Sequence, residues 1–184
     1  MNVELDLPAP EDWRVLANLW PLYVHDISAF NGARPNRHGV LSDDDAWGSL
    51  EEHGASIRSW WQDGEALKPY VIRVDGVVAG FQLNATHPYL AKSIEADWVI
   101  HEFFLLHAFR GQGVGDRAVE LGVRAQPGTW EVVTDVSNAR AAAFWRRALG
   151  EITDGRFEEA RVEHAWGPKI AWTFEIEAPP RART

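Results

Sequence analysis

Residues 103–125 read FFLLHAFRGQGVGDRAVELGVRA, and this stretch decides the fold. Its apolar start, residues 103–106, predicts a buried strand, and the glycine-rich segment 110–115 predicts a tight loop. Apolar residues then recur at helical spacing, at Val114, Ala118, Leu121, Gly122 and Ala125. The first N–H groups of a helix have no internal partner, and the helix dipole adds positive charge there. The stretch therefore predicts that a phosphate or pyrophosphate docks at residues 110–116.

The composition is typical of one globular domain and excludes several classes of function. The 184 residues are 46% hydrophobic and 24% charged, which suits a packed globule rather than a disordered chain. The absence of cysteine excludes disulfides, zinc–thiolate sites and a cysteine nucleophile. A net charge of −9 argues against a nucleic-acid partner. The sequence has neither a signal-peptide pattern nor an apolar run of about 18 residues, so we expect a cytoplasmic protein without a membrane partner.

The chain carries ten tryptophans, which are many for its length. Most of them are expected to fill the core and the contacts between helices and sheet. The alternative is that one or two line an apolar or cationic ligand site.

The hydrophobic periodicity along the chain predicts a mixed α/β fold in one domain, residues 1–178, followed by a disordered tail, residues 179–184. Ser42 is expected to cap a helix whose first turn holds the acidic residues 43–45, in preference to a metal site. Asp75-Gly76 predicts a hairpin turn, and Gly150 predicts a helix end. The expected strands are 3–7, 70–74, 77–83, 94–106, 130–134, 151–160 and 165–176, and the expected helices are 11–28 (with a kink at Pro21), one from residue 42, one after residue 113, and 138–149.

The glycine loop does not fit the two best-known phosphate-binding patterns. A P-loop ends in Gly-Lys-Ser/Thr, whereas this loop continues Gly115-Asp116-Arg117. A dinucleotide fingerprint belongs early in a parallel β-α-β unit, but this loop follows a hairpin beyond the middle of the chain. The chain also lacks Gly-x-Ser-x-Gly and a helical His-x-x-x-His, which leaves an unrelated hydrolase or metal enzyme with little support.

Two segments instead resemble motifs of the GNAT superfamily of N-acetyltransferases. Arg110-x-x-Gly113-x-Gly115 resembles motif A, and the segment from Asn138 to Phe144-Trp145, closing at Leu149-Gly150, is similar to motif B. The order of the expected elements agrees with that superfamily over nearly the whole chain. The resemblance implies the GNAT fold, with a mostly antiparallel sheet of about seven strands, splayed near the glycine loop, and about four helices.

The resemblance further implies transfer of an acetyl group from acetyl-CoA to a primary amine, without a metal. Strand backbone would hold the pantetheine arm, loop amides would wrap the pyrophosphate, and residues of the later helix would complete the site. By position, the cofactor-binding residues are Phe103, Phe104, Leu105, Arg110, Gly111, Gln112, Gly113, Val114, Gly115, Asp116, Asn138, Phe144 and Trp145. Asp116 places a carboxylate beside the expected pyrophosphate, which departs from an ideal phosphate site. This carboxylate is expected to stabilise the start of the helix instead.

Glu102 is the predicted catalytic residue, acting as the general base that deprotonates the acceptor ammonium. Burial beside aromatic residues would raise its pKa into the useful range; the alternative is a structural carboxylate paired across the sheet. His101, expected on the other face of the strand, is the second candidate, and His107 is expected to face solvent. Many relatives carry an acidic tyrosine where this chain has Trp145, whose indole is only a hydrogen-bond donor.

The acceptor site is expected on the first two helices and the loop between them. The predicted substrate-binding residues are Trp20, Tyr23, Asp26 and Phe30, with His25 and Trp60 or Trp61 nearby. Aromatic rings near Asp26 would suit a cationic amine, although each residue has ordinary helix packing as its alternative. The acceptor class stays open between small amines, amino acids, aminoglycoside-like antibiotics and protein N-termini, and the protein is expected to be a monomer or homodimer. The competing interpretation is a CoA-binding module with little or no catalysis.

Overall fold

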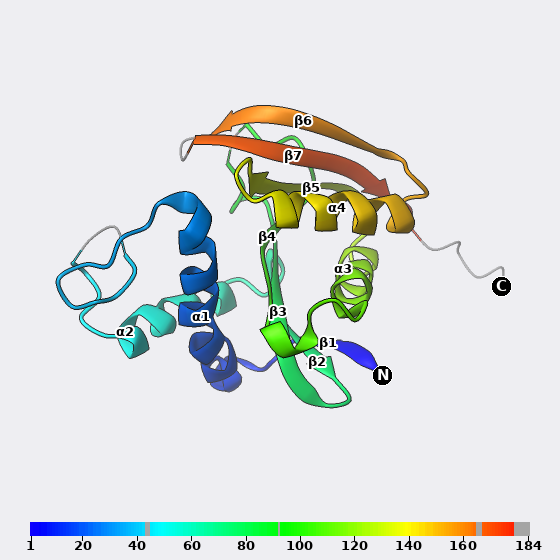
Figure 1. Ribbon diagram of the computed structural model, residues 1–184. Helices are drawn as coiled ribbons and strands as arrows, with labels where there is room; N and C mark the ends of the chain where they lie inside the picture. The colour runs from blue at the N-terminus through cyan, green and yellow to red at the C-terminus, as the bar shows by residue number, and fades with distance from the viewer. Residues whose placement is uncertain (43–44, 92, 165–166, 179–184) are drawn as a thin grey trace.

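The computed structural model describes residues 1–42, 45–91, 93–164 and 167–178. Over these residues, seven strands form one sheet in the order β1-β2-β3-β4-β5-β7-β6. The strands are β1 (Val3–Asp6), β2 (Leu67–Val74), β3 (Val77–Thr86), β4 (Trp98–Leu105), β5 (Gly128–Asp135), β6 (Phe157–His164) and β7 (Gly167–Ile176). The helices are α1 (Arg14–Asn31), α2 (Leu50–Ala55), α3 (Val114–Arg124) and α4 (Ala139–Ile152), with 3-10 turns η1 (Pro10–Asp12), η2 (Ser56–Trp61) and η3 (His107–Phe109). The predicted mixed, mostly antiparallel sheet is confirmed (Figure 1).

The β2–β3 hairpin has the turn that its sequence predicts. Asp75 and Gly76 both adopt positive φ, 49° and 81°, and Val74 pairs with Val77 across the turn. Two consecutive positive φ values give a turn whose twist matches that of the flanking strands. The hairpin then places β3 in the middle of the sheet, beside β4.

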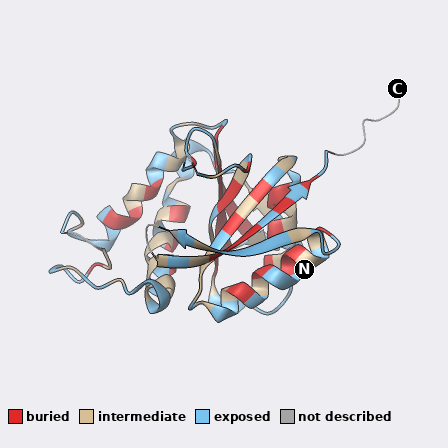
Figure 2. Cartoon of the chain, turned by 90° about the horizontal axis from the view of Figure 1, so that it is seen from above, coloured by how far each residue is buried: buried red, intermediate tan, exposed pale blue. Residues whose placement is uncertain are grey.

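The core has one layer on each face of the sheet. On one face, Leu16 and Leu19 of α1 pack in a cluster with Phe104 of β4. On the other face, α3 and α4 cover a cluster that includes Trp130 and Trp172, both fully buried. The buried positions of Figure 2 lie along the sheet and the inner sides of the helices, so these two tryptophans have the predicted packing role. Within the described ranges, no helix combines the length and apolar character needed to cross a membrane.

The sheet opens between β4 and β5, its one parallel pair. These strands pair only from Trp98 to Ile100 on β4, while β4 continues to Leu105. On its other side, β4 pairs with β3 along its length, but the register shifts so that Leu83 faces Glu102 and Asn84 faces Ile100. The shift is a β-bulge at His101, which bends β4 away from β5. The predicted splay near the glycine loop is therefore present.

The second helix begins later than predicted. α2 starts at Leu50, and Ser49 rather than Ser42 caps it, accepting a hydrogen bond from the Glu52 backbone N–H at 3.1 Å. The Glu52 carboxylate in turn accepts from the Gly48 N–H at 2.8 Å. This Ser-x-x-Glu pattern satisfies two backbone N–H groups at the start of α2. Asp45 lies in a turn 3.6 Å from Arg37, and residues 43–44 lie outside the described residues.

Several other predicted boundaries are wrong, including those of α4, β4 and β6. α4 continues through Gly150 to Ile152, and its C-cap Thr153 returns a hydroxyl hydrogen bond to the Leu149 carbonyl at 2.7 Å. β4 begins at Trp98 rather than residue 94, and β6 begins at Phe157 rather than residue 151. β4 and β6 are thus shorter at their starts than predicted, whereas α4 continues past its predicted end. The predicted tail at 179–184 lies outside the described residues.

Gly54 allows α2 to touch α1, and its replacement by alanine is expected to destabilise the fold. A Cβ on Gly54 would lie 2.4 Å from the carbonyl oxygen of Ala17, which is backbone and cannot yield without moving a helix. Overpacking of this kind costs about 1–3 kcal/mol in the free energy of unfolding. Chemical denaturation of Gly54→Ala measures it. Gly150→Ala is the matched control, because Gly150 has open space at its Cβ position within α4, so alanine there should stabilise by about 0.4–1 kcal/mol.

Candidate active site

The glycine loop presents backbone N–H groups at the start of α3. Gly111 and Gly113 have φ of 73° and 79°, a region that side chains rarely adopt. Gly113 is the N-cap of α3 and provides no side-chain hydrogen bond to the first turn. Residues 111–113 are exposed, so the loop amides are open to solvent rather than enclosed. The predicted anion site is therefore geometrically available at residues 110–116.

Gly115 brings α3 close to α4. A Cβ on Gly115 would lie 2.9 Å from Phe144, so only glycine fits without a shift of that ring. Phe144 stacks on Phe103 with ring centroids 5.5 Å apart, and Trp145 meets the same Phe103 ring edge-on at 5.7 Å. Trp145 is 5% exposed and belongs to the core. Of the two predicted cofactor residues on α4, Trp145 is thus mainly a packing residue, and Phe144 lines the contact between helix and strand.

The splayed part of β4 offers backbone groups toward β5. Leu106 N–H donates to the Ala79 carbonyl of β3 at 2.8 Å. Backbone groups alternate along a strand, so those of Phe103 and Leu105 point to the opposite edge. β5 no longer pairs with β4 at these positions. This edge can receive an extended amide-containing arm in the manner of an added strand.

Two predicted cofactor-binding side chains have structural partners. Asp116 forms an ion pair with Arg147 of α4, with N–O distances of 2.8 and 3.0 Å. The Asn138 side chain accepts from the Ala141 N–H at 3.0 Å and so caps α4. Asp116 therefore helps to join α3 to α4, and its backbone N–H is the part of it that can serve an anion site.

Glu102 lies on the α1 face of the sheet, beside the splay. The Tyr23 hydroxyl donates to its Oε2 atom, and His101 Nδ1 lies 3.5 Å from Oε1. The side chain is 23% exposed. Burial raises the pKa of Glu102 to about 8, although the positive charge of Lys169 opposes that shift. A carboxyl group with this pKa is ionised, and able to accept a proton, at pH values above about 8.

His101 does not lie on the face that strand alternation predicts. The bulge turns it to the same face as Glu102, where its ring meets Trp60 of η2 edge-on, with ring centroids 5.4 Å apart. Burial lowers the pKa of His101, which favours its neutral form. His107 is 74% exposed, as expected for a turn residue.

The four predicted acceptor residues separate into different environments. Tyr23 contacts Glu102 directly. Trp20 packs against Tyr23 and Phe81, and its buried indole nitrogen has no hydrogen-bond partner among the described residues. Asp26 forms an ion pair with Arg110 at 2.5 Å. Phe30 is 38% exposed, and its carbonyl accepts from the Ser137 hydroxyl at 3.4 Å.

Sequence reasoning missed the contribution of the last strands. Lys169 of β7 lies 3.0 Å from Asp135 at the end of β5, and its charge acts on Glu102. Lys169 and Glu102 are brought together only by the strand order of the sheet, so no local pattern signals their proximity. His25 is 80% exposed, and the Trp61 indole donates to the Pro8 carbonyl at 3.0 Å, away from Glu102.

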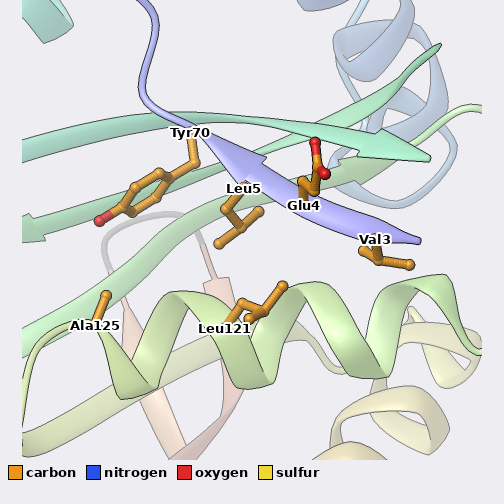
Figure 3. A pocket seen from close by; sticks show the side chains of 6 residues that line it. All are labelled: Val3, Glu4, Leu5, Tyr70, Leu121 and Ala125. Carbon is orange, nitrogen blue, oxygen red and sulfur yellow. The ribbon is translucent and has the colours of Figure 1, made fainter. Parts of the chain in front are cut away.

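A separate hollow of about 350 Å³ lies between β1 and α3 (Figure 3). Its lining is mostly apolar and consists of Val3, Glu4, Leu5, Tyr70, Leu121 and Ala125. None of these residues belongs to the glycine loop or to the surroundings of Glu102. The candidate active site is therefore the open splay and its rim rather than this hollow.

Comparison with known proteins identifies the family. A family model described as "Acetyltransferase (GNAT) family" matches residues 37–150. The chain therefore belongs to the GNAT acetyltransferase family, which supports acyl transfer as its activity. No curated protein matched the sequence.

Solved structures share the fold at low sequence identity. An acetyltransferase from Thermus thermophilus has 15% identity and a TM-score of 0.64, covering 96% of this chain and 98% of that one. RimL, a ribosomal L7/L12 α-N-protein acetyltransferase in complex with coenzyme A, has 16% identity and a TM-score of 0.64, with 97% of both chains covered. The aminoglycoside acetyltransferase AAC(6')-Ib in complex with coenzyme A has 20% identity and a TM-score of 0.60, with 95% of both covered.

Proposed function

We propose that this protein transfers the acetyl group of acetyl-CoA to a primary amine by direct attack. The observation that carries the proposal is the position of Glu102, a mostly buried carboxyl group held by Tyr23 beside the open edge of β4. The proposed anion site at the start of α3 and the proposed base would then belong to consecutive parts of one strand–loop–helix unit. That several neighbours with this fold were solved with coenzyme A supports the choice of co-substrate.

The residues present suit acetyl-CoA. The backbone N–H groups of the exposed residues 111–113 and of the first turn of α3, together with the dipole of α3, would hold the diphosphate. The backbone of Phe103 and Leu105 would hold the pantetheine amides along the splay. A backbone N–H at that edge would also stabilise the negative oxygen that forms on the acetyl carbonyl. Among the residues that the structure describes, no cluster suited to a metal ion is found, and the proposed reaction needs none.

In the proposed reaction, the Glu102 carboxylate accepts a proton from the acceptor ammonium. The freed amine lone pair attacks the acetyl carbonyl carbon and forms a C–N bond. The attacking nitrogen then loses its remaining extra proton to water. Collapse of the tetrahedral intermediate breaks the C–S bond, and the sulfur leaves as thiolate. We assign return of a proton to that sulfur to water, because Trp145 is buried and its indole is a poor acid.

The pH dependence of turnover is expected to follow the ionisation of the Glu102 carboxyl group. Its raised pKa means that the carboxyl group is protonated, and inactive as a base, below about pH 8. The value of kcat/KM should therefore rise with pH up to about 8, with a slope near one on logarithmic axes. The acceptor ammonium adds its own inflection. In Glu102→Gln, only the inflection near 8 should disappear, and its persistence would exclude Glu102 as its source.

The alternative is a CoA-binding module without catalysis, and the packing of Trp145 in place of an acid favours it. Titration with acetyl-CoA in a calorimeter tests binding, which both functions require. A scan of amine acceptors with a thiol reagent then tests turnover, because each transfer releases one CoA thiol. The protein has no cysteine and gives no background in that assay. Binding without thiol release from alkylamines, amino acids, aminoglycosides or peptide N-termini would favour the binding module.

A further inference from the structure

The side chain of Arg110 is engaged on every nitrogen. Its Nε donates to the Leu105 carbonyl at 2.7 Å, and its Nη2 donates to Asp26 Oδ2 at 2.5 Å. Its Nη1 lies 3.2 Å from His107 Nε2, and the guanidinium sits 5.6 Å from the centre of the Phe104 ring. Arg110 opens the glycine loop, yet its side chain reaches a helix 84 residues earlier in the chain.

Asp26 and Tyr23 lie three residues apart on α1, which puts both on one face of the helix. Tyr23 donates to Glu102, and Asp26 holds Arg110. A single turn of α1 therefore contacts both the proposed base and the first residue of the proposed diphosphate loop. Arg110 also donates to the backbone carbonyl of Leu105, which is the last residue of β4. These contacts connect the start of the loop to the helix that carries the partner of Glu102.

We infer that the Asp26–Arg110 pair is a positioning device, which couples occupancy of the glycine loop to the placement of Tyr23 and Glu102. The inference rests on the proposed function, since it assumes a diphosphate at the loop. Arg110 then acts as a positioning residue rather than as a direct phosphate ligand, because its side-chain N–H groups already have partners within the fold. The opposite possibility, that Arg110 leaves Asp26 to bind the diphosphate, is an outcome that the experiment below separates.

The Asp26–Arg110 pair is suited to remain intact while Glu102 titrates. Partial burial raises the pKa of Asp26, but Arg110 and His107 outweigh burial and hold it below its usual range. Asp26 therefore stays ionised near pH 8. The groups that face Glu102 are the Tyr23 hydroxyl, His101 and Lys169, and the test leaves all three unchanged.

The experiment follows the Glu102 carboxyl group by NMR of protein labelled with 13C-glutamate, assigned by comparison with Glu102→Gln. The probe is adenosine 3′-phosphate 5′-diphosphate, the part of CoA without the pantetheine arm, so it occupies the loop without touching the acetyl site. In the unmodified protein, saturation with this probe should shift the Glu102 titration midpoint by about one pH unit, a tenfold change in proton affinity. In Asp26→Asn and in Arg110→Gln the shift should fall below about a third of a unit, with probe affinity within about threefold of the original.

The variants should behave as members of one unit. The double variant should show no further loss beyond either single variant, and Asp26→Glu should restore most of the shift because it keeps the carboxylate. Glu120→Gln is the matched control: it breaks ion pairs with Arg117 and Arg124 on the surface of α3, and it should keep the full shift.

The remaining outcomes of this experiment would contradict either the positioning role of Arg110 or the proposed function. A shift that is absent from the unmodified protein, or equal in all variants, while the probe binds would overturn the positioning role alone. Loss of probe affinity by about tenfold or more in Arg110→Gln but not in Asp26→Asn would make Arg110 a diphosphate ligand instead. Failure of the unmodified protein to bind either the probe or acetyl-CoA would remove the proposed function, and the positioning role with it.

Discussion

Replacing Glu102 with glutamine is expected to lower acetyl transfer at least ~10²-fold, which is a typical share for a general base. Glutamine keeps the shape of the side chain and can still accept the Tyr23 hydrogen bond. It cannot take a proton from an ammonium group. The measurement is the rate of thiol release from acetyl-CoA with an amine found in the acceptor scan, together with acetyl-CoA affinity by calorimetry, which should stay within about twofold.

Tyr23→Phe is the companion variant, because it removes the partner of the carboxylate and leaves the base in place. Its loss of rate should be smaller, on the order of tenfold, since only orientation is affected. Near-normal turnover in Glu102→Gln with intact acetyl-CoA binding would remove Glu102 from the role of base, and His101, 3.5 Å away, would become the first candidate.

A folding defect in Glu102→Gln can be recognised from the sign of its effect on stability. The folded-state pKa of Glu102, about 8, lies above the ordinary value of 4.5, so its protonated form is the one that favours folding. Its contribution to stability is therefore full at acid pH and is lost as pH rises through about 8. At pH values above that point, Glu102→Gln should melt at a higher temperature than the unmodified protein. A lower melting temperature there would mean that the rate loss has a structural component.

The parts of the fold that were predicted from sequence rest on local patterns. The Asp75-Gly76 turn and the Gly111 and Gly113 positions need backbone conformations that few residues adopt, so their sequence signal is strong. Motif A lies on such a loop, and motif B lies on a single continuous helix, so both are local patterns from which the family and the mixed sheet could be predicted. The start of α2 was also available locally, in the Ser49-x-x-Glu52 pattern, but the acidic run before it gave a competing signal.

The arrangement of the candidate site depended on contacts that have no local signal. The bulge at His101 arises from the register between β3 and β4, and it reverses the face that alternation predicts. Asp26 meets Arg110 because α1 crosses beside the end of β4, and Lys169 meets Asp135 because β7 returns beside β5. Tyr23 is predicted to bind the acceptor, and the structure adds a contact with Glu102 that the sequence did not indicate. Such pairings follow from strand order, which periodicity does not encode.

Gly113→Ala is expected to weaken acetyl-CoA binding by at least about tenfold. A second variant with the same backbone strain separates the loss of binding from the loss of stability. Gly113 has φ of 79°, and alanine there costs about 1–2 kcal/mol in the folded state. If the loop relaxes to avoid that strain, the first N–H groups of α3 no longer converge on one point. Those amides are the proposed ligands of the diphosphate, so affinity should fall with the geometry. Calorimetry with acetyl-CoA gives the affinity, and denaturation gives the stability.

Gly39→Ala provides a closely matched control. Gly39 has φ of 78° and, like Gly113, open space where a Cβ would be added, so the two substitutions carry the same conformational cost. Both variants should lose similar stability, but Gly39→Ala should bind acetyl-CoA as the unmodified protein does, because residue 39 lies outside the β4–α3 unit. Equal affinities in the two variants would mean that the amides after Arg110 do not hold the diphosphate. In that case the co-substrate would have to be held by the splayed edge of β4 alone, whose backbone groups offer far less charge complementarity than a helix start.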